Sequence, residues 1–95
     1  MIVSMMKVLF ALSGIESLKD KRQIVRSVRD KLQKKFRLSV AEVALQDSLA
    51  FAEMGAALVS NDKDFGETVL RKAFTMIEND VPARIEDVSF YSEEF

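Results

Sequence analysis

Apolar residues alternate with other residues along segment 3–13, which predicts a β-strand. Gly14 ends this segment. One face of the strand is entirely apolar and is expected in the core, whereas the opposite face is mixed. The core face carries Met6, Val8, Phe10 and Leu12, and the opposite face carries Met5, Lys7, Leu9 and Ala11.

The pattern then changes to a helical period. Ser17 is a suitable N-cap, and apolar residues recur at helical spacing from there to Phe36, which predicts an amphipathic helix. Lys21 and Lys35 project near the apolar arc, and we expect both to extend from its edges toward solvent. The arc itself consists of Leu18, Ile24, Val25, Val28, Leu32 and Phe36.

Two more strands follow, joined by a hairpin turn at 46–48. The first covers 38–45, and its apolar phase shifts midway, which indicates a β-bulge near Ala41 or Glu42. The second covers 51–60 and alternates regularly. Its expected core face consists of Ala52, Met54, Ala56 and Leu58.

A second helix is predicted after these strands. Asp64, with Glu67 three residues later, has the spacing of a capping box, and Asp62 is the alternative N-cap. Gly66 lies inside the buried arc, where helix and sheet can approach closely. Pro82 follows the end of the helix, and a fourth strand covers 84–92. The rest of the arc is Val69, Ala73, Met76 and Ile77.

The order of elements is strand, helix, strand, strand, helix, strand, which is the split β-α-β arrangement. Right-handed crossovers place the first and third strands at the centre of the sheet. We therefore predict an α+β fold, a ferredoxin-like βαββαβ sandwich with a four-stranded antiparallel sheet and two helices on one face. At 95 residues the chain is expected to form one domain, residues 1–95.

Composition removes several classes of function. The chain has no cysteine and no histidine, so it lacks thiol nucleophiles, the usual metal ligands and the usual neutral-pH general base. No catalytic constellation is present, and we expect no enzyme activity, no cofactor and no metal. The apolar run near the N-terminus is too short for a signal peptide or a membrane span, so a cytoplasmic location is expected.

Charge is distributed unevenly. Residues 16–37 contain nine basic and three acidic residues, a net charge of +6, whereas the remainder contains five basic and twelve acidic residues, a net charge of −7. Five basic residues fall on one flank of the predicted helix and are candidates to contact a negatively charged partner. Lys34 and Lys35 are lesser candidates for such contacts. This basic row consists of Lys19, Arg22, Arg26, Arg29 and Arg37.

Three interpretations of the basic row remain open: a solvated helix face, a site for RNA phosphates, or a site for an acidic protein surface, including the acidic half of a second copy. A second feature is an apolar patch expected on the sheet face away from the helices. It favours a sheet-to-sheet homodimer or, less strongly, a small apolar ligand, unless loops or Phe95 cover it. The patch consists of Leu9, Ala11, Gly55, Ala57 and Val59.

Four short motifs resemble those of one family: Ser-Leu-Lys-Asp-Lys-Arg at 17–22, Ser-Val-Ala-Glu-Val at 39–43, Gln-Asp at 46–47 and Val-Ser-Asn-Asp at 59–62. The chain resembles the YlxP-like proteins, small bacterial proteins of unassigned function. The family often has Gly-Asp before Gln-Asp and a Trp after it, whereas this chain has Ala44-Leu45 and Ser48-Leu49.

The resemblance implies a ferredoxin-like fold. The genes of the YlxP-like family tend to lie beside those of translation and ribosome-maturation factors, which implies structured RNA as a partner. Our working hypothesis is a non-enzymatic accessory module of ribosome assembly or translation that contacts RNA phosphates through the basic row. The competing hypothesis is a protein-interaction or homodimerisation module.

Overall fold

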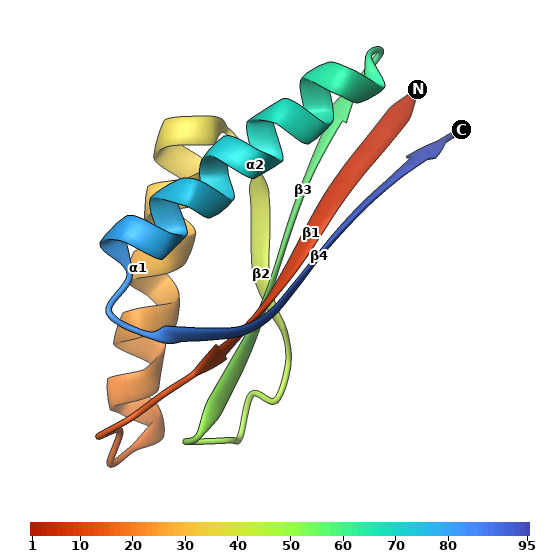
Figure 1. Ribbon diagram of the computed structural model, residues 1–95. Coiled ribbons are helices and arrows are strands. Elements are labelled where there is room, and N and C mark those ends of the chain that lie inside the picture. The colour runs from red at the N-terminus through yellow and green to blue at the C-terminus, as the bar shows by residue number, and fades with distance from the viewer.

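The computed structural model describes all 95 residues. The chain forms six elements, and their order is the predicted one (Figure 1). They are β1 (Ile2–Ala11), α1 (Leu18–Phe36), β2 (Ser39–Ala44), β3 (Phe51–Ser60), α2 (Lys63–Asp80) and β4 (Arg84–Glu94).

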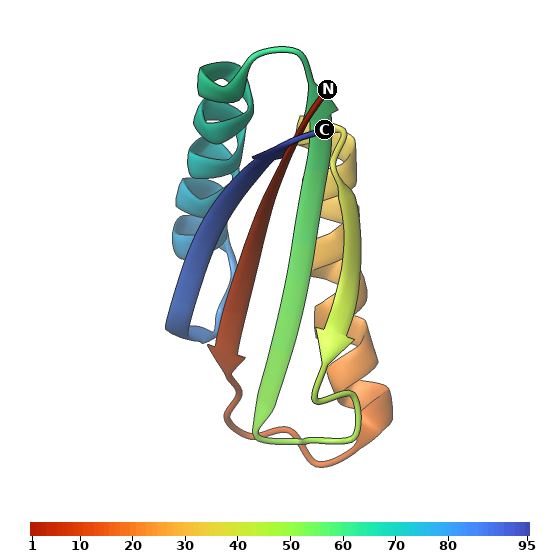
Figure 2. The same ribbon diagram turned by 90° about the vertical axis from the view of Figure 1, so that its right-hand side faces the viewer.

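The four strands form one antiparallel sheet in the order β2-β3-β1-β4. Both helices lie on the same face of this twisted sheet, and the other face has no covering layer (Figure 1). Turning the molecule shows α1 beside the edge strand β2 and α2 beside the opposite edge strand, β4 (Figure 2). The predicted α+β ferredoxin-like arrangement is therefore confirmed.

The core lies between the sheet and the two helices. Met6, Val8 and Phe10 of β1 are at most 2% exposed, which confirms these three residues of the predicted core face. The fourth, Leu12, lies beyond the end of β1 and is half-buried against the core. Leu70, which the predicted arc of the second helix lacks, is also buried. The remaining core side chains come from α1, β2, β3, α2 and the residues that flank them, whereas β4 contributes only partly buried side chains. These core residues are mostly aliphatic: Val28, Leu32, Leu38, Val40, Met54, Ala56, Ala73, Met76, Ile77 and Val81.

Helix α1 begins and ends with side-chain and backbone caps. Ser17 Oγ accepts a hydrogen bond from the Asp20 N–H at 3.1 Å, which confirms Ser17 as the N-cap. At the other end Arg37 adopts a left-handed conformation, φ 54°, and its N–H donates to the Gln33 carbonyl. The chain therefore turns sharply between the end of α1 and the start of β2.

The prediction of Asp64 as the N-cap of α2 is wrong. Asp62 is the cap, and its Oδ1 accepts hydrogen bonds from the N–H groups of Asp64 and Phe65. Because the helix already begins at Lys63, the Asp64 carboxylate lies in the first turn and contributes only through the helix dipole. The predicted close approach at Gly66 is confirmed, since a Cβ there would lie 2.3 Å from Ser4 Oγ.

The predicted bulge in the second strand is present one residue beyond the expected position. The register of β2 against β3 shifts between Glu42 and Ala44. Val43, at the shift, leaves the pairing and places its side chain over Gly55, where a Cβ would lie 2.9 Å from Val43 Cγ1. Glu42 stays in phase with the buried Val40, so its carboxylate is directed to the core side of the sheet.

Candidate nucleic-acid interface

Helix α1 lies at the β2 side of the molecule (Figure 2). By helical spacing, the basic row falls on the flank of α1 that faces away from α2. The opposite flank faces α2, because Ile24 and Lys31 line a hollow together with Val81 and Pro82. Arg29 is half-buried. The other members of the row, Lys19, Arg22, Arg26 and Arg37, are exposed.

Most of this charge has no acidic partner in the protein. Within the row only Arg29 forms an ion pair, with the neighbouring Asp30 at 3.2 Å. The chain's other ion pairs involve basic residues outside the row: Lys7, Lys21, Lys63 and Arg84. Lys19, Arg22, Arg26 and Arg37 are therefore free to meet negative charge from another molecule.

The two lesser candidates do not extend the row. Lys34 is exposed in the last turn of α1, where its charge complements the helix dipole. Lys35 lies on the α2 side, in a hollow shared with Lys72 and Met76, and its ammonium is 5.7 Å from the centre of the Phe36 ring. Both contribute positive charge at the end of α1, but neither lies beside Arg26.

Lys21 does not reach solvent, and the expectation that it would do so is wrong. It is 1% exposed, and its Nζ donates to the Leu45 carbonyl at 2.6 Å and lies 3.0 Å from Glu42 Oε2. This Oε2 is buried and accepts no hydrogen bond, so charge rather than hydrogen-bond alignment holds it against Nζ. A second, longer bond joins Nζ to the Gln46 carbonyl.

The Lys21 contacts fix the start of α1 to the β2–β3 connection. Leu45 adopts a left-handed conformation, φ 62°, and its carbonyl receives the shortest of the ammonium's bonds. The sequence contains a signal for this pair, because Lys21 lies within the apolar arc rather than at the edge expected for it above, and Glu42 is in phase with the buried Val40. Opposite charges at two core positions indicate a buried ion pair.

The predicted apolar patch is assembled as expected, but it is interrupted by charge. Alternate residues of β1 and β3 share the outer face of the sheet, and the Lys7–Glu53 ion pair, 3.7 Å, crosses its middle. Val59 of the patch is 64% exposed and Phe95 is itself 66% exposed, so Phe95 leaves at least Val59 uncovered. The five predicted residues, Leu9, Ala11, Gly55, Ala57 and Val59, all lie on this face.

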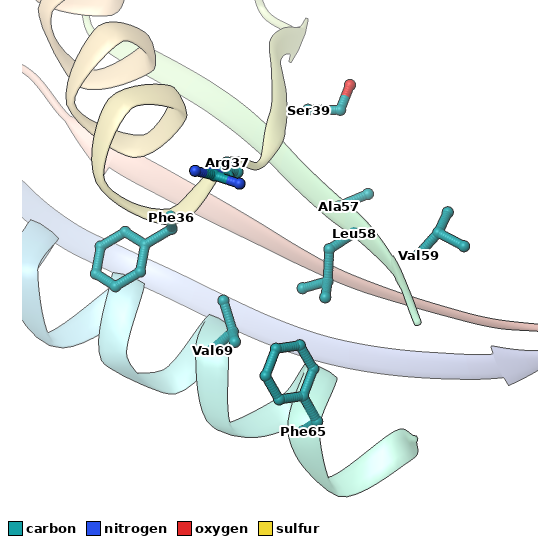
Figure 3. A pocket seen from close by; sticks show the side chains of 8 residues that line it. All are labelled: Phe36, Arg37, Ser39, Ala57, Leu58, Val59, Phe65 and Val69. Carbon is teal, nitrogen blue, oxygen red and sulfur yellow. The ribbon is translucent and has the colours of Figure 1, made fainter. Parts of the chain in front are cut away.

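A groove that the sequence analysis missed lies at the C-terminal end of the basic row. It has a volume of about 420 Å³ and is formed where α1 ends, β2 begins and α2 begins (Figure 3). The available signal is Phe65, a large apolar residue that follows the N-cap of α2 and lies outside the arc predicted to be buried; it is 57% exposed. The lining consists of Phe36, Arg37, Ser39, Ala57, Leu58, Val59, Phe65 and Val69.

Two further observations concern other kinds of site. No group of three or more acidic, cysteine or histidine side chains is placed to hold a metal ion. Neither helix has the length and apolar character needed to cross a membrane. The basic row and the groove beside its end are thus the surface features with the clearest chemical character.

Two solved structures are similar to this one at low sequence identity. The crystal structure of At3g17210 from Arabidopsis thaliana is 6% identical, with a TM-score of 0.54 over 98% of this chain and 94% of that chain. A de novo designed protein with a ferredoxin fold is 9% identical, with a TM-score of 0.51 over 98% of this chain and 83% of that chain. At these identities the similarity concerns the fold alone.

Sequence comparison gives a closer relationship. A family model described as Protein of unknown function (DUF503) matches residues 3–90. The Uncharacterized protein YlxP of Bacillus subtilis (strain 168) is 30% identical over 63 residues, which are 66% of this chain and 68% of that protein. These two matches agree with the four motifs described above, and the chain therefore belongs to the YlxP-like family described as DUF503.

Proposed function

We propose that this protein binds structured RNA without catalysis, as an accessory module of ribosome assembly or translation, and that the basic row of α1 contacts the RNA phosphates. The observation that supports this most strongly is the set of exposed basic side chains without acidic partners, Lys19, Arg22, Arg26 and Arg37. Phosphate contacts of this kind position a protein on its RNA without reading base sequence.

One energetic and one geometric argument favour a negatively charged partner. Arg22 and Arg26 are four residues apart and Arg26 and Arg29 three apart, and each like-charged pair costs a few tenths of a kcal/mol, about 0.2–0.5, in the free helix. A phosphate placed between such residues removes that cost. The row from Arg22 to Arg37 extends about 22 Å along the helix at ~1.5 Å per residue, which is long enough for several phosphates.

The proposal is tested by binding to fluorescently labelled ribosomal RNA fragments, followed by anisotropy. The test variant is Arg22→Glu/Arg26→Glu/Arg29→Glu. A matched control, Lys7→Glu/Lys63→Glu/Arg84→Glu, makes the same change in net charge at side chains that are 63%, 64% and 77% exposed and lie outside α1.

We expect the α1 variant to lose at least tenfold in affinity and the control variant to lose much less, with both proteins retaining the wild-type circular dichroism spectrum. Equal losses in the two variants would mean that net charge alone attracts RNA, and the row would then have no special role. Absence of wild-type binding would contradict the proposal directly.

A second candidate function is self-association through the outer sheet face. The observation that favours it is that large apolar residues on this face are uncovered: Val59 is 64%, Tyr91 58% and Phe95 66% exposed. The Lys7–Glu53 ion pair in the same face weighs against it. Sedimentation equilibrium of wild type and Val59→Lys distinguishes the two cases, since a sheet-face dimer would dissociate in the variant.

A further inference from the structure

The groove at the end of α1 combines an apolar interior with a cationic rim. Leu58 and Val69 form its floor, the rings of Phe36 and Phe65 stand on either side of Val69, and Arg37 lies above them (Figure 3). Phe65 is 57% exposed, so much of its ring surface is uncovered. A flat apolar ligand with a nearby negative charge would match this combination.

The groove also presents backbone hydrogen-bonding groups. The Leu12 N–H donates to the Ala50 carbonyl, and this pair continues the register of the β1–β3 ladder. The backbone N–H and carbonyl groups of even-numbered β3 residues therefore bond to β1, and those of odd-numbered residues are directed toward β2. The last β2–β3 pair is Ser39 with Ala57. The N–H and carbonyl of Val59 therefore extend past the start of β2 and have no strand partner there.

Arg37 explains why β2 stops short of Val59. The next ladder position opposite Val59 would be residue 37, but Arg37 is the left-handed C-cap of α1 and its N–H bonds to Gln33. The chain turns away at this residue, and the Arg37 side chain remains at the rim of the groove. The same residue thus ends the basic row and borders the open part of β3.

We propose that this groove binds a single unstacked nucleobase of the RNA, with the adjoining phosphate on Arg37. This inference rests on the proposed function and adds to it a preference for RNA that contains an unpaired nucleotide. Proteins commonly hold such bases against aromatic side chains and arginine planes. A base edge offers a hydrogen-bond donor and an acceptor side by side, and the free carbonyl and N–H of Val59 complement that pair.

Continuity and charge favour a nucleotide over an extended apolar peptide. An RNA strand that follows Arg22, Arg26 and Arg29 reaches Arg37 without leaving the basic flank, whereas a peptide would leave that charge unpaired. The acidic residues at the start of α2 are Asp62, Asp64 and Glu67, and none of them lines the groove. Asp62 accepts hydrogen bonds from two backbone N–H groups, and Glu67 pairs with Lys63.

The test compares two labelled RNA hairpins that differ only in one bulged nucleotide. We expect the wild-type protein to bind the bulged hairpin roughly tenfold more tightly than the fully paired one, because stacking on an aromatic side chain favours the free base. Phe65→Ala should abolish most of this preference and leave the affinity for the paired hairpin unchanged. Tyr91→Ala, which removes an aromatic of similar exposure on the outer sheet face, is the matched control and should keep the preference.

Placing 2-aminopurine at the bulge gives a second readout, since its fluorescence should change when the base enters the groove of the wild type but not of Phe65→Ala. Equal wild-type affinity for both hairpins would overturn the base site and leave the proposed function standing. A groove that binds a peptide instead of a base would also give equal affinities. Failure of the wild type to bind either hairpin would overturn both.

Discussion

Replacing Lys21 with methionine should destabilise the protein far more than replacing any lysine of the surface. The change keeps the apolar volume but leaves the Glu42 carboxylate, whose side chain is 17% exposed, without its counter-charge. It also removes the donor to the Leu45 and Gln46 carbonyls. Removing one partner of a buried ion pair costs about 3–5 kcal/mol, and the residual exposure of Glu42 places our expectation near ~3 kcal/mol.

For a chain of this size, ~3 kcal/mol corresponds to a fall in Tm of roughly 12–24 °C. Thermal and urea unfolding followed by circular dichroism measure it. In Lys21→Met/Glu42→Leu neither charge remains, so much of the lost free energy of unfolding should return. The control is Lys63→Met at the exposed pair with Glu67, which should change stability by less than about 0.5 kcal/mol.

The reasoning would be refuted if Lys21→Met were as stable as wild type, or if the double variant were destabilised by the sum of the two single changes. Either result would mean that Lys21 and Glu42 do not act as a pair in the folded protein.

Two further predictions concern α2, and both are measured as changes in the free energy of unfolding. Gly66→Ala should destabilise the protein by about 1–3 kcal/mol, although alanine has the better helix propensity, because the new Cβ would lie 2.3 Å from Ser4 Oγ. Adding Ser4→Ala should recover part of the loss, and no recovery would contradict the steric explanation. Asp62→Ala should cost ~1 kcal/mol as the loss of an N-cap, whereas Asp64→Ala should cost about half of that or less; the reverse order would restore Asp64 as the cap.

Periodicity in the sequence was sufficient to predict the fold. The third strand was predicted with its observed bounds, 51–60, and Ser17 was predicted as the cap of α1, because these features depend on neighbours within a few residues. The cap of α2 was misassigned because Asp62 and Asp64 are both suitable residues, and only the position of the first helical turn distinguishes them.

The features that sequence reasoning missed involve contacts between distant elements. Lys21 was expected to reach solvent because the pattern of one helix does not reveal that its ammonium contacts Glu42 and the backbone carbonyls after β2. The groove was missed for a similar reason, since it exists only because β2 begins opposite Ala57 while β3 continues to Ser60. The basic row, by contrast, was inferred from spacing within one helix: Lys19, Arg22, Arg26 and Arg29 lie in α1, and Arg37 is its C-cap.

The central claim is that individual side chains of the basic row contact RNA phosphates, and the salt dependence of RNA affinity tests it most directly. If about four phosphates are engaged, the logarithm of the wild-type association constant should fall with the logarithm of salt concentration at a slope of roughly −3 to −4. Arg26→Gln should reduce the magnitude of that slope by about 1, whereas Lys7→Gln, outside the row, should leave it unchanged. A wild-type slope near zero, or equal slopes for the wild type and Arg26→Gln, would contradict the account.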